Sequence, residues 1–252
     1  MNNMRVFLEI VRFEVRQQFV SLFVWACILV SFILHFLTIG SVGITLWTHP
    51  QADINSIYAV AVVHSTLSML NVLPVIVLVA NAFLRDHERD MASLFFVKPI
   101  YKWQYFGARF VAAVVLAAFM GLSGVLGSLL GCTMPWVDQL RLAAFSWQPF
   151  LFSFGYIVLP NLFTLCALFF SIAALTRSLP FTFTLAGVII TLNALLGGVN
   201  LNSDISPGSV ALADYSAMLV IDHASRNLSI TELNTLYPTE LLFENRLLWL
   251  AL

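Results

Sequence analysis

Long uninterrupted runs of apolar residues, separated by short polar segments, dominate the chain. Continuous runs favour membrane-crossing helices over the alternating strands of a barrel, and a helix satisfies its own backbone in lipid. At about 1.5 Å of rise per residue, five runs reach the roughly 30 Å thickness of the hydrocarbon layer. We expect spans at residues 19–40, 57–84, 105–133, 148–175 and 182–200. The sequence therefore predicts an all-α polytopic membrane protein.

Residues 1–18 show a different pattern, in which apolar residues recur at helical spacing and the charged residues lie largely elsewhere on the wheel. We expect an amphipathic helix that lies in the membrane interface before the first span. Its interfacial residues are Phe7, Arg12, Glu14 and Arg16. The alternative is a simple N-terminal extension of the first span.

The C-terminal part of the chain is more polar. Residues 201–240 are richer in Ser, Asn, Asp and Pro and predict an external loop, within which the stretch ALADYSAMLVIDHASRNL is expected to form a short helix. The apolar pattern resumes at Leu241. Residues 241–252 are therefore expected to be the start of a truncated sixth span.

Composition agrees with the membrane class. Hydrophobic residues make up 60% of the 252 residues and charged residues 10%, which excludes an ordinary soluble domain. The net charge is −1, and no nucleic-acid partner is expected. Cys27, Cys132 and Cys166 lie in or at the edge of apolar runs, so we expect packing residues rather than a disulfide or a metal site.

The Lys and Arg residues predict the orientation. With a cytoplasmic N-terminus, nine of the 12 fall on the cytoplasmic side, and only Arg141, Arg226 and Arg246 fall outside. Residues 85–104, which join the second and third expected spans, then face the cytoplasm. Acidic residues precede the run MASLFFV there and Pro99 follows it, so a short helix is expected to end by Lys98. Its apolar tip fits either docking to a partner or a loop that dips into lipid.

This segment resembles the cytoplasmic loop after the second span in ABC type-2 exporter permeases. That family's pattern is Arg-Asp, a nearby glutamate, an apolar run, a proline and a Tyr-x-x-Gly-x-Arg-Phe motif that begins the third span. The chain matches it at Arg85, Asp86, Glu88, residues 94–97, Pro99, Tyr105, Gly107, Arg109 and Phe110. The amphipathic start, the spans and the orientation fit the same family along nearly the whole chain. Asp90 departs from the pattern, because the family often has glycine there.

The resemblance implies that residues 90–98 are a coupling helix that rests in a groove of an ATP-hydrolysing subunit. The implied coupling residues are Arg85, Asp86, Glu88, Arg89, Leu94, Phe95, Phe96, Lys98 and Pro99. Phe95 and Phe96 are expected to anchor the contact, and Arg89 and Lys98 to form its rim. Glu88 is expected to pair with Arg12 or Arg16 of the amphipathic helix. A second permease half, identical or in the same longer chain, would complete the path.

Two motifs are absent from the sequence. It contains no G-x-x-x-x-G-K-[ST] phosphate loop, so ATP and Mg are expected on the partner subunit and no cofactor on this chain. HERDM at His87 begins like the zinc motif H-E-x-x-H but lacks the second histidine, so no enzyme activity is expected in these residues. The C-terminal stretches RNLSITELN and ELLFENRLLWLAL resemble long bacterial polypeptides in which such a permease precedes a zinc aminopeptidase domain.

Polar side chains interrupt the spans at His35, His64, Asn71, Asn81, Asn161 and Asn193. Such groups either mark pathways or bond neighbouring helices, and for the asparagines we favour the bonding role. His64 and Asn71, two turns apart, are the candidate translocation-path pair. Pro74 and Pro160 are expected to kink the second and fourth spans, and the small residues of GLSGVLGSLLG to let the third span pack closely.

Together, these features predict the permease subunit of an ATP-driven exporter, multi-pass in a bacterial inner membrane with its N-terminus in the cytoplasm. Its expected partners are lipid, an ABC ATPase subunit and a second permease half. One alternative is the membrane anchor of a fused or associated zinc aminopeptidase, without transport. A passive channel is a further alternative, and it would not need a cytoplasmic docking tip.

Overall fold

The computed structural model describes residues 3–41, 48–88, 101–176, 178–202 and 207–251, and all regular secondary structure in these residues is helical. The longer helices are α1 (Asn3–Phe19), α2 (Leu22–Gly40), α3 (Ile57–Ser68), α4 (Val72–Glu88), α6 (Lys102–Cys132), α8 (Leu159–Thr176), α9 (Leu179–Asn202) and α13 (Thr239–Ala251). The shorter ones are η2 (Gln139–Arg141), α7 (Gln148–Ser153), η3 (Phe154–Val158), α10 (Pro207–Ala213), α11 (Met218–Ser225) and α12 (Ile230–Thr235).

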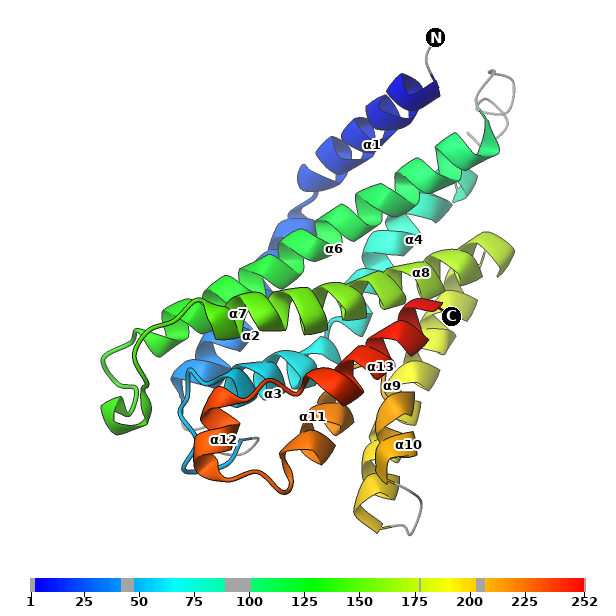
Figure 1. The fold of residues 1–252 in the computed structure, drawn as a ribbon. Helices are drawn as coiled ribbons and strands as arrows, with labels where there is room; N and C mark the ends of the chain where they lie inside the picture. The colour runs from blue at the N-terminus through cyan, green and yellow to red at the C-terminus, as the bar shows by residue number, and fades with distance from the viewer. Residues whose placement is uncertain (1–2, 42–47, 89–100, 177, 203–206, 252) are drawn as a thin grey trace.

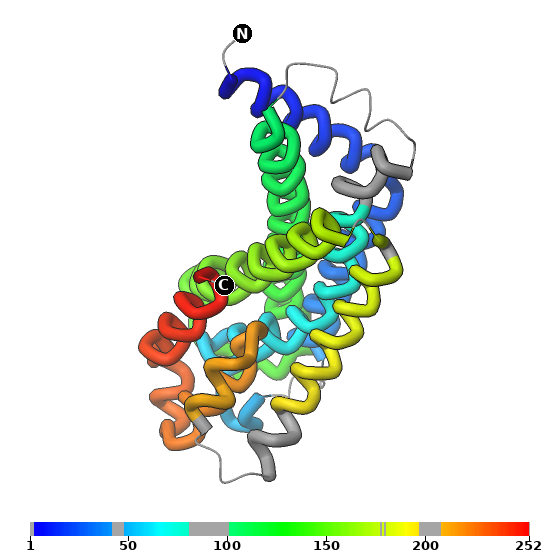
Figure 2. Tube along the Cα trace, turned by 90° about the vertical axis from the view of Figure 1, so that its right-hand side faces the viewer, coloured from blue at the N-terminus to red at the C-terminus, as the bar shows by residue number. Residues whose placement is uncertain are grey.

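The helices form an elongated bundle with two distinct ends (Figure 1). One end carries α1, the end of α4 and the start of α6, and we call it the α1 end. The other carries α10, α11, α12 and the start of α3, and we call it the α12 end. The two ends are also well separated in the perpendicular view (Figure 2). The long helix α6 runs between them.

Three helical segments are long and apolar enough to cross a membrane: Leu22–Gly40, Lys102–Cys132 and Gln148–Thr176. A fourth span results if α3 and α4, which are bent by 51° at their junction, are counted as one. In α9, the described apolar stretch is the shorter Pro180–Leu196. The structure therefore shows three to four candidate spans, and the expected five complete spans plus the start of a sixth are not confirmed.

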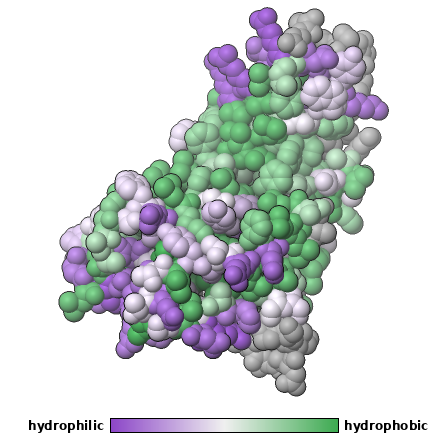
Figure 3. All heavy atoms as spheres, viewed as in Figure 1, coloured by the Kyte–Doolittle hydropathy of each residue, from purple (hydrophilic) through white to green (hydrophobic). Residues whose placement is uncertain are grey.

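The outer surface supports a membrane environment for the middle of the bundle. Leu126, Leu151 and Phe163, on α6, α7 and α8, are 46%, 66% and 38% exposed. Figure 3 shows apolar surface over the middle of this face, between polar atoms at the α1 end and polar atoms near α11 and α12. A broad exposed apolar surface between two polar ends is the pattern of a lipid-facing protein.

The expected kink is present in the second span, whereas the fourth contains a π-helical turn before its proline and stays continuous. Pro74 is the third residue of α4, and the chain breaks at residues 69–71 just before it, because proline fits the first turn of a helix but not its interior. Pro160 follows the π-helical turn η3, which keeps Gln148–Thr176 continuous. A widened turn accommodates the ring and the missing N–H of a proline within a helix. The second span is therefore broken, whereas the fourth is only distorted.

Small residues let α6 pack closely on its neighbours, as expected. A Cβ atom at Gly127 would lie 2.3 Å from the carbonyl oxygen of Phe32, and one at Gly131 would lie 2.7 Å from that of Phe36. Both carbonyls belong to α2. On another side of α6, a Cβ atom at Gly121 would lie 2.6 Å from a side-chain carbon of η3 and 2.7 Å from one of α8. The backbones of α2 and α6 therefore approach to a distance that only glycine permits.

The α12 end is a folded cap. The stretch expected to form one short helix contains the end of α10 and all of α11. These two helices pack with α3, α7 and α13 around a small core of their own. Asn234 accepts a hydrogen bond from the backbone N–H of Asp53 at 3.0 Å and donates to its carboxylate at 2.9 Å. Asn55 bonds the backbone N–H and carbonyl of Ala143, both at 2.9 Å. Segments far apart in the sequence are therefore joined here.

Candidate functional site

The expected ATPase-coupling residues lie in and after the last turns of α4. Arg85, Asp86 and Glu88 belong to α4, and their side chains are outside the described part of the structure. The remaining coupling residues, Arg89, Leu94, Phe95, Phe96, Lys98 and Pro99, lie outside the described residues. The site is therefore built from its flanks, which are the end of α4, the start of α6, and α1 (Figure 1).

Gln104 ties the start of α6 to α1. Its side chain is buried, and its Oε1 accepts a hydrogen bond from the backbone N–H of Tyr101 at 3.0 Å. Its Nε2 donates to the carbonyl oxygen of Asn3 at 2.9 Å. One side chain thus satisfies a backbone donor at the N-terminus of α6 and holds the first turn of α1.

Aromatic contacts continue along the same two helices. The rings of Phe7 and Trp103 are stacked with centroids 5.9 Å apart, and Phe19 meets Phe119 edge to face at 5.4 Å. Gly107 leaves room for the Phe7 ring, because a Cβ atom there would lie 3.4 Å from it. The contacts advance in the same direction on both helices. We conclude that α1 runs alongside the first half of α6.

A buried ion pair completes this junction. Arg109 Nη2 lies 3.1 Å from Glu14 Oε1, and the two side chains are 3% and 2% exposed. The Arg109 guanidinium also lies 4.3 Å above the centroid of the Tyr105 ring. Removing one partner of a buried pair leaves an uncompensated charge, so the pair strongly favours this one placement of α1.

The four residues expected at the membrane interface differ in their exposure. Arg12 and Arg16 are exposed, whereas Phe7 is half-buried and Glu14 is buried against α6. Two residues, Val20 and Ser21, separate α1 from α2, so α1 is a helix of its own rather than an extension of the first span. Sequence reasoning missed the partnership of Glu14 with Arg109, since nothing near either residue identifies the other.

His64 faces a second histidine inside the bundle. The ring centroids of His35 in α2 and His64 in α3 are 5.0 Å apart, and both side chains are buried. Each Nδ1 lies 2.8 Å from a backbone carbonyl oxygen one turn earlier, that of Ser31 or Val60. The tautomer that satisfies these carbonyls leaves each Nε2 as an acceptor, and His64 Nε2 lies 3.4 Å from Ser128 Oγ. The pair thus links α2, α3 and α6.

The structure does not bring His64 together with Asn71. Within the described residues His64 contacts His35 and Ser128, while Asn71 lies in the break between α3 and α4. The break turns the chain, so two residues two turns apart no longer share one helix face. Gly124 of α6 leaves room for the His35 ring, because a Cβ atom at this glycine would lie 2.8 Å from the ring.

Asp214 is the centre of a second polar cluster, at the α12 end. It is fully buried at the turn between α10 and α11. Its Oδ1 accepts hydrogen bonds from Asn193 Nδ2 at 2.9 Å, from the N–H of Ser216 at 2.8 Å and from Ser216 Oγ at 2.7 Å. Its Oδ2 accepts from the N–H of Leu219 at 2.8 Å. One carboxylate therefore caps the first turn of α11 and holds α9.

Arg246 extends this cluster to α13 and α8. It is 4% exposed and donates hydrogen bonds to Asn161 Oδ1 and to the carbonyl oxygen of Tyr215. Asn161 in turn donates to the carbonyl oxygen of Ser216 at 3.0 Å. Burial and the nearby Asp214 carboxylate raise the pKa of Tyr215 above its ordinary value. Asn161, like Asn193, bonds a neighbouring segment, as expected for asparagines in spans.

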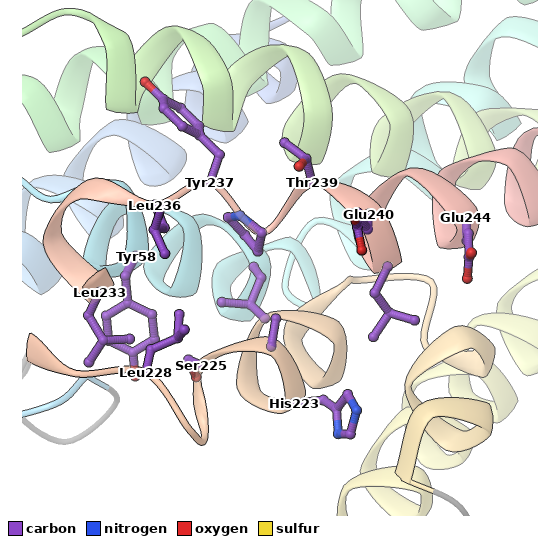
Figure 4. A pocket seen from close by; sticks show the side chains of 14 residues that line it. Tyr58, His223, Ser225, Leu228, Leu233, Leu236, Tyr237, Thr239, Glu240 and Glu244 are labelled. Atoms are coloured by element: carbon purple, nitrogen blue, oxygen red, sulfur yellow. The ribbon is translucent and has the colours of Figure 1, made fainter. Parts of the chain in front are cut away.

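A cleft of about 520 Å³ opens at the α12 end between α3, α11, α12 and α13 (Figure 4). Tyr58 and Leu233 line it with apolar surface, and Glu240, Glu244 and His223 supply its charged and polar groups. The close-up shows the two glutamates on α13 and the histidine on α11. The cleft belongs to the folded cap, since its walls are cap helices.

Beside this cleft, Glu232 takes part in capping the N-terminus of α12. The N–H and Oγ of Ser229 each donate to Glu232 Oε2 at 2.7 Å. These two hydrogen bonds favour the carboxylate and lower the pKa of Glu232 below its ordinary value. The motif is a capping box that fixes the start of the helix.

Among the described residues, no group of three or more His, Cys, Asp or Glu side chains is placed to hold a metal ion. Cys27, Cys132 and Cys166 are free thiols. No protein-family model matches the chain, and no curated protein matches it. Function is therefore inferred from the residues and from the geometry.

Proposed function

We propose that residues 1–252 are the transmembrane permease of an ABC type-2 exporter, driven by a separate ATPase subunit. The observation that carries the proposal is the α1–α6 junction, where α1 is fixed to the start of α6, the helix that follows the segment resembling the family's coupling loop. The buried Glu14–Arg109 pair and the Gln104 bridge make α1 and α6 one unit. A passive channel or a simple anchor has no need for such a unit.

The dimensions of α6 support this role. Its 31 residues extend about 46 Å at about 1.5 Å per residue, which exceeds the roughly 30 Å hydrocarbon layer. The charged residues of α6, Lys102 and Arg109, are both in its first turns, so we place the excess length at the α1 end. The coupling segment would then stand clear of the lipid, within reach of a soluble subunit.

In the proposed mechanism, ATP binding closes two partner subunits, and residues 85–104 move with them. The movement passes into the bundle through α4 and through the α1–α6 unit. The break at residues 69–71 gives α4 a hinge against α3, which packs into the fixed cap. ATP drives the change because it binds the closed arrangement better, and this chain converts that difference into an outward-open path.

The proposal is tested by co-purification from the native host in mild detergent, followed by mass spectrometry of the associated chains. We expect an associated chain with an intact phosphate loop. The double variant Phe95→Asp/Phe96→Asp should abolish the association without preventing membrane insertion, because two charges replace the apolar anchors. Normal association of that variant would contradict the assigned anchors, and the absence of any ATPase with the native chain would contradict the exporter.

A matched control uses exposed aromatic residues at the other end. Phe145 and Trp147 are 56% and 57% exposed in the segment before α7. The double variant Phe145→Asp/Trp147→Asp carries the same added charge and should keep the ATPase. Labelling of single cysteines at positions 95 and 222 tests the orientation: the first should react from the cytoplasm and the second from outside. The reverse pattern would contradict the proposed topology.

A further inference from the structure

A cavity of about 470 Å³ lies beside the break between α3 and α4. One wall is α2, from Phe23 to Leu34, and the opposite wall is formed by Leu70, Asn71 and the first turns of α4. Met120 of α6 and Phe183 of α9 complete it. Its volume falls within the roughly 300–1,000 Å³ of small-molecule sites.

The cavity opens within the apolar middle of the bundle. Val30, Leu70 and Leu73, which line it, are 54%, 51% and 54% exposed. Val30 and Leu73 lie on candidate spans and Leu70 lies in the break of one, so in a membrane the opening would face the hydrocarbon layer. A ligand would therefore enter from the hydrocarbon layer, which selects for lipophilic molecules.

One polar group distinguishes this cavity from a simple lipid groove. Asn71 is 7% exposed and lines it, and the described part of the chain offers its side-chain amide no hydrogen bond. Ser31, the other polar residue of the wall, already donates to the carbonyl oxygen of Met120 at 3.2 Å. An unpaired amide in apolar surroundings is costly, so this amide favours a ligand that brings a hydrogen-bonding group.

The depth of Asn71 narrows the choice of ligand. Along α2 the wall extends over about 16 Å from Phe23 to Leu34, about half of the hydrocarbon thickness. Helix α4 runs back from the break towards the α1 end (Figure 1). Because Asn71 lies in the break, at the start of α4, we infer that it lies at the deep end of the cavity, away from the membrane surface. The ester and head groups of a bilayer phospholipid remain near that surface. A phospholipid acyl chain would fill the apolar volume and leave the amide unpaired.

We propose that this cavity binds a lipophilic small molecule with one hydrogen-bonding group, whose apolar body lies along α2 and α4 and whose polar group meets the Asn71 amide. The inference concerns binding alone and does not depend on a partner ATPase. It would hold for an exporter and for a membrane anchor. Its test therefore uses neither transport nor ATP hydrolysis.

The experiment compares three photo-crosslinking probes on the purified full chain in lipid nanodiscs. The first is a diazirine-bearing dodecanamide, the second is the same diazirine alkane without the amide, and the third is phosphatidylcholine with the diazirine in an acyl chain. Mass spectrometry quantifies the label on peptides from α2 and α4. We expect saturable labelling by the amide probe, blocked by unlabelled dodecanamide, and labelling by the alkane that is about tenfold weaker, as one net hydrogen bond implies.

Three variants locate the site. Asn71→Leu should weaken the amide probe by about tenfold and leave the alkane unchanged, because it removes one hydrogen bond at similar volume. Ala26→Phe should block both probes, since Ala26 lines the cavity and the added ring fills it. The control Leu192→Phe adds bulk at an exposed position of α9 and should change neither. Equal labelling by the amide and the alkane would overturn the proposal. So would an Asn71→Leu variant that the amide probe labels as strongly as it labels the wild type.

Thiol modification of the wild-type chain tests the same cavity without any variant that could misfold. Cys27 lines the cavity, whereas Cys132 and Cys166 do not. Dodecanamide should slow the modification of Cys27 by N-ethylmaleimide and leave the other two thiols unaffected. Phosphatidylcholine labelling that dodecanamide cannot displace would show a bilayer lipid in the cavity and would also refute the inference.

Discussion

The two ends of the molecule are held together in different ways. At the α1 end, the described residues attach α1 to α6 through the buried Glu14–Arg109 ion pair, the bridging Gln104 and aromatic stacking. At the α12 end, the Asp214 cluster and reciprocal asparagine bonds join α8, α9, α11, α13 and the loops before α3 and α7. The described side-chain contacts of the first end connect α1 with α6 and α2, whereas those of the second extend over many segments.

This difference indicates which end moves as a unit and which end stays fixed. Contacts that connect few helices can shift with less disturbance of the remainder, whereas a network across many segments resists local opening. In the proposed exporter, motion enters at the α1 end and the α12 end is the stationary base. Four predictions test or refine the contrast.

The largest effect is expected from breaking the α12 network at its centre. Asp214→Ala removes the acceptor of four hydrogen bonds and leaves buried donors unpaired, so we expect a loss of about 3–5 kcal/mol in unfolding free energy. Thermal unfolding in detergent measures it. The control Asp222→Ala breaks an exposed 2.8 Å ion pair with Arg226 and should cost less than about 1 kcal/mol. Equal losses would refute a central role for Asp214.

A large but local effect is expected at the α1 end. Arg109→Met removes the buried Glu14–Arg109 ion pair, and we expect α1 to loosen from α6 at a cost of about 3 kcal/mol. Hydrogen exchange should rise in α1 and remain unchanged at the α12 end. The double variant Glu14→Leu/Arg109→Met should restore most of the protection, because both charges of the buried pair are removed together. Arg16→Met, at an exposed position, is the control; exchange rising throughout the chain would contradict the contrast.

A smaller effect is expected in the middle, where α2 and α6 connect the two ends. Gly127→Ala places a methyl group against the backbone of Phe32, which cannot rotate away, so we expect a loss of about 1–3 kcal/mol. Gly187→Ala in α9 is the matched control, because no atom lies within 4 Å of its added Cβ. Thermal unfolding should separate the two variants. An unchanged unfolding free energy in Gly127→Ala would contradict the close approach of the α2 and α6 backbones.

The smallest effect is expected from pH at the α12 cap. The lowered pKa of Glu232 means that its stabilising contribution is fully present above the ordinary value of 4.5 and is lost as the pH falls through the lowered value. The difference in Tm between the wild type and Glu232→Gln should therefore be constant above about pH 5 and shrink below it. The same comparison with Glu240→Gln, outside the capping box, is the control. A difference that grows on acidification would reverse the assigned sign.

Local physics made part of this structure predictable. Apolar runs gave helices that overlap every expected span, although length and apolarity support three to four spans rather than five. Proline chemistry predicted the bend of the second span, whereas the fourth stays continuous through a π-helical turn before Pro160. Small residues predicted the close face of α6. Each of these follows from the geometry of one helix or from the size of one side chain. The coupling assignment rests on a sequence pattern and stays a prediction.

Only the tertiary structure decided which polar residues meet. Glu14 and Arg109 are 95 positions apart, and His35 and His64 belong to different helices, as do Asn161 and Arg246. A sequence of uniformly apolar helices leaves their rotation and register almost undetermined, because turning such a helix exchanges one apolar face for another. The arrangement is fixed by the few polar groups that must find partners and by the glycines that allow close approach. Those choices involve contacts between distant segments, which local pattern does not encode.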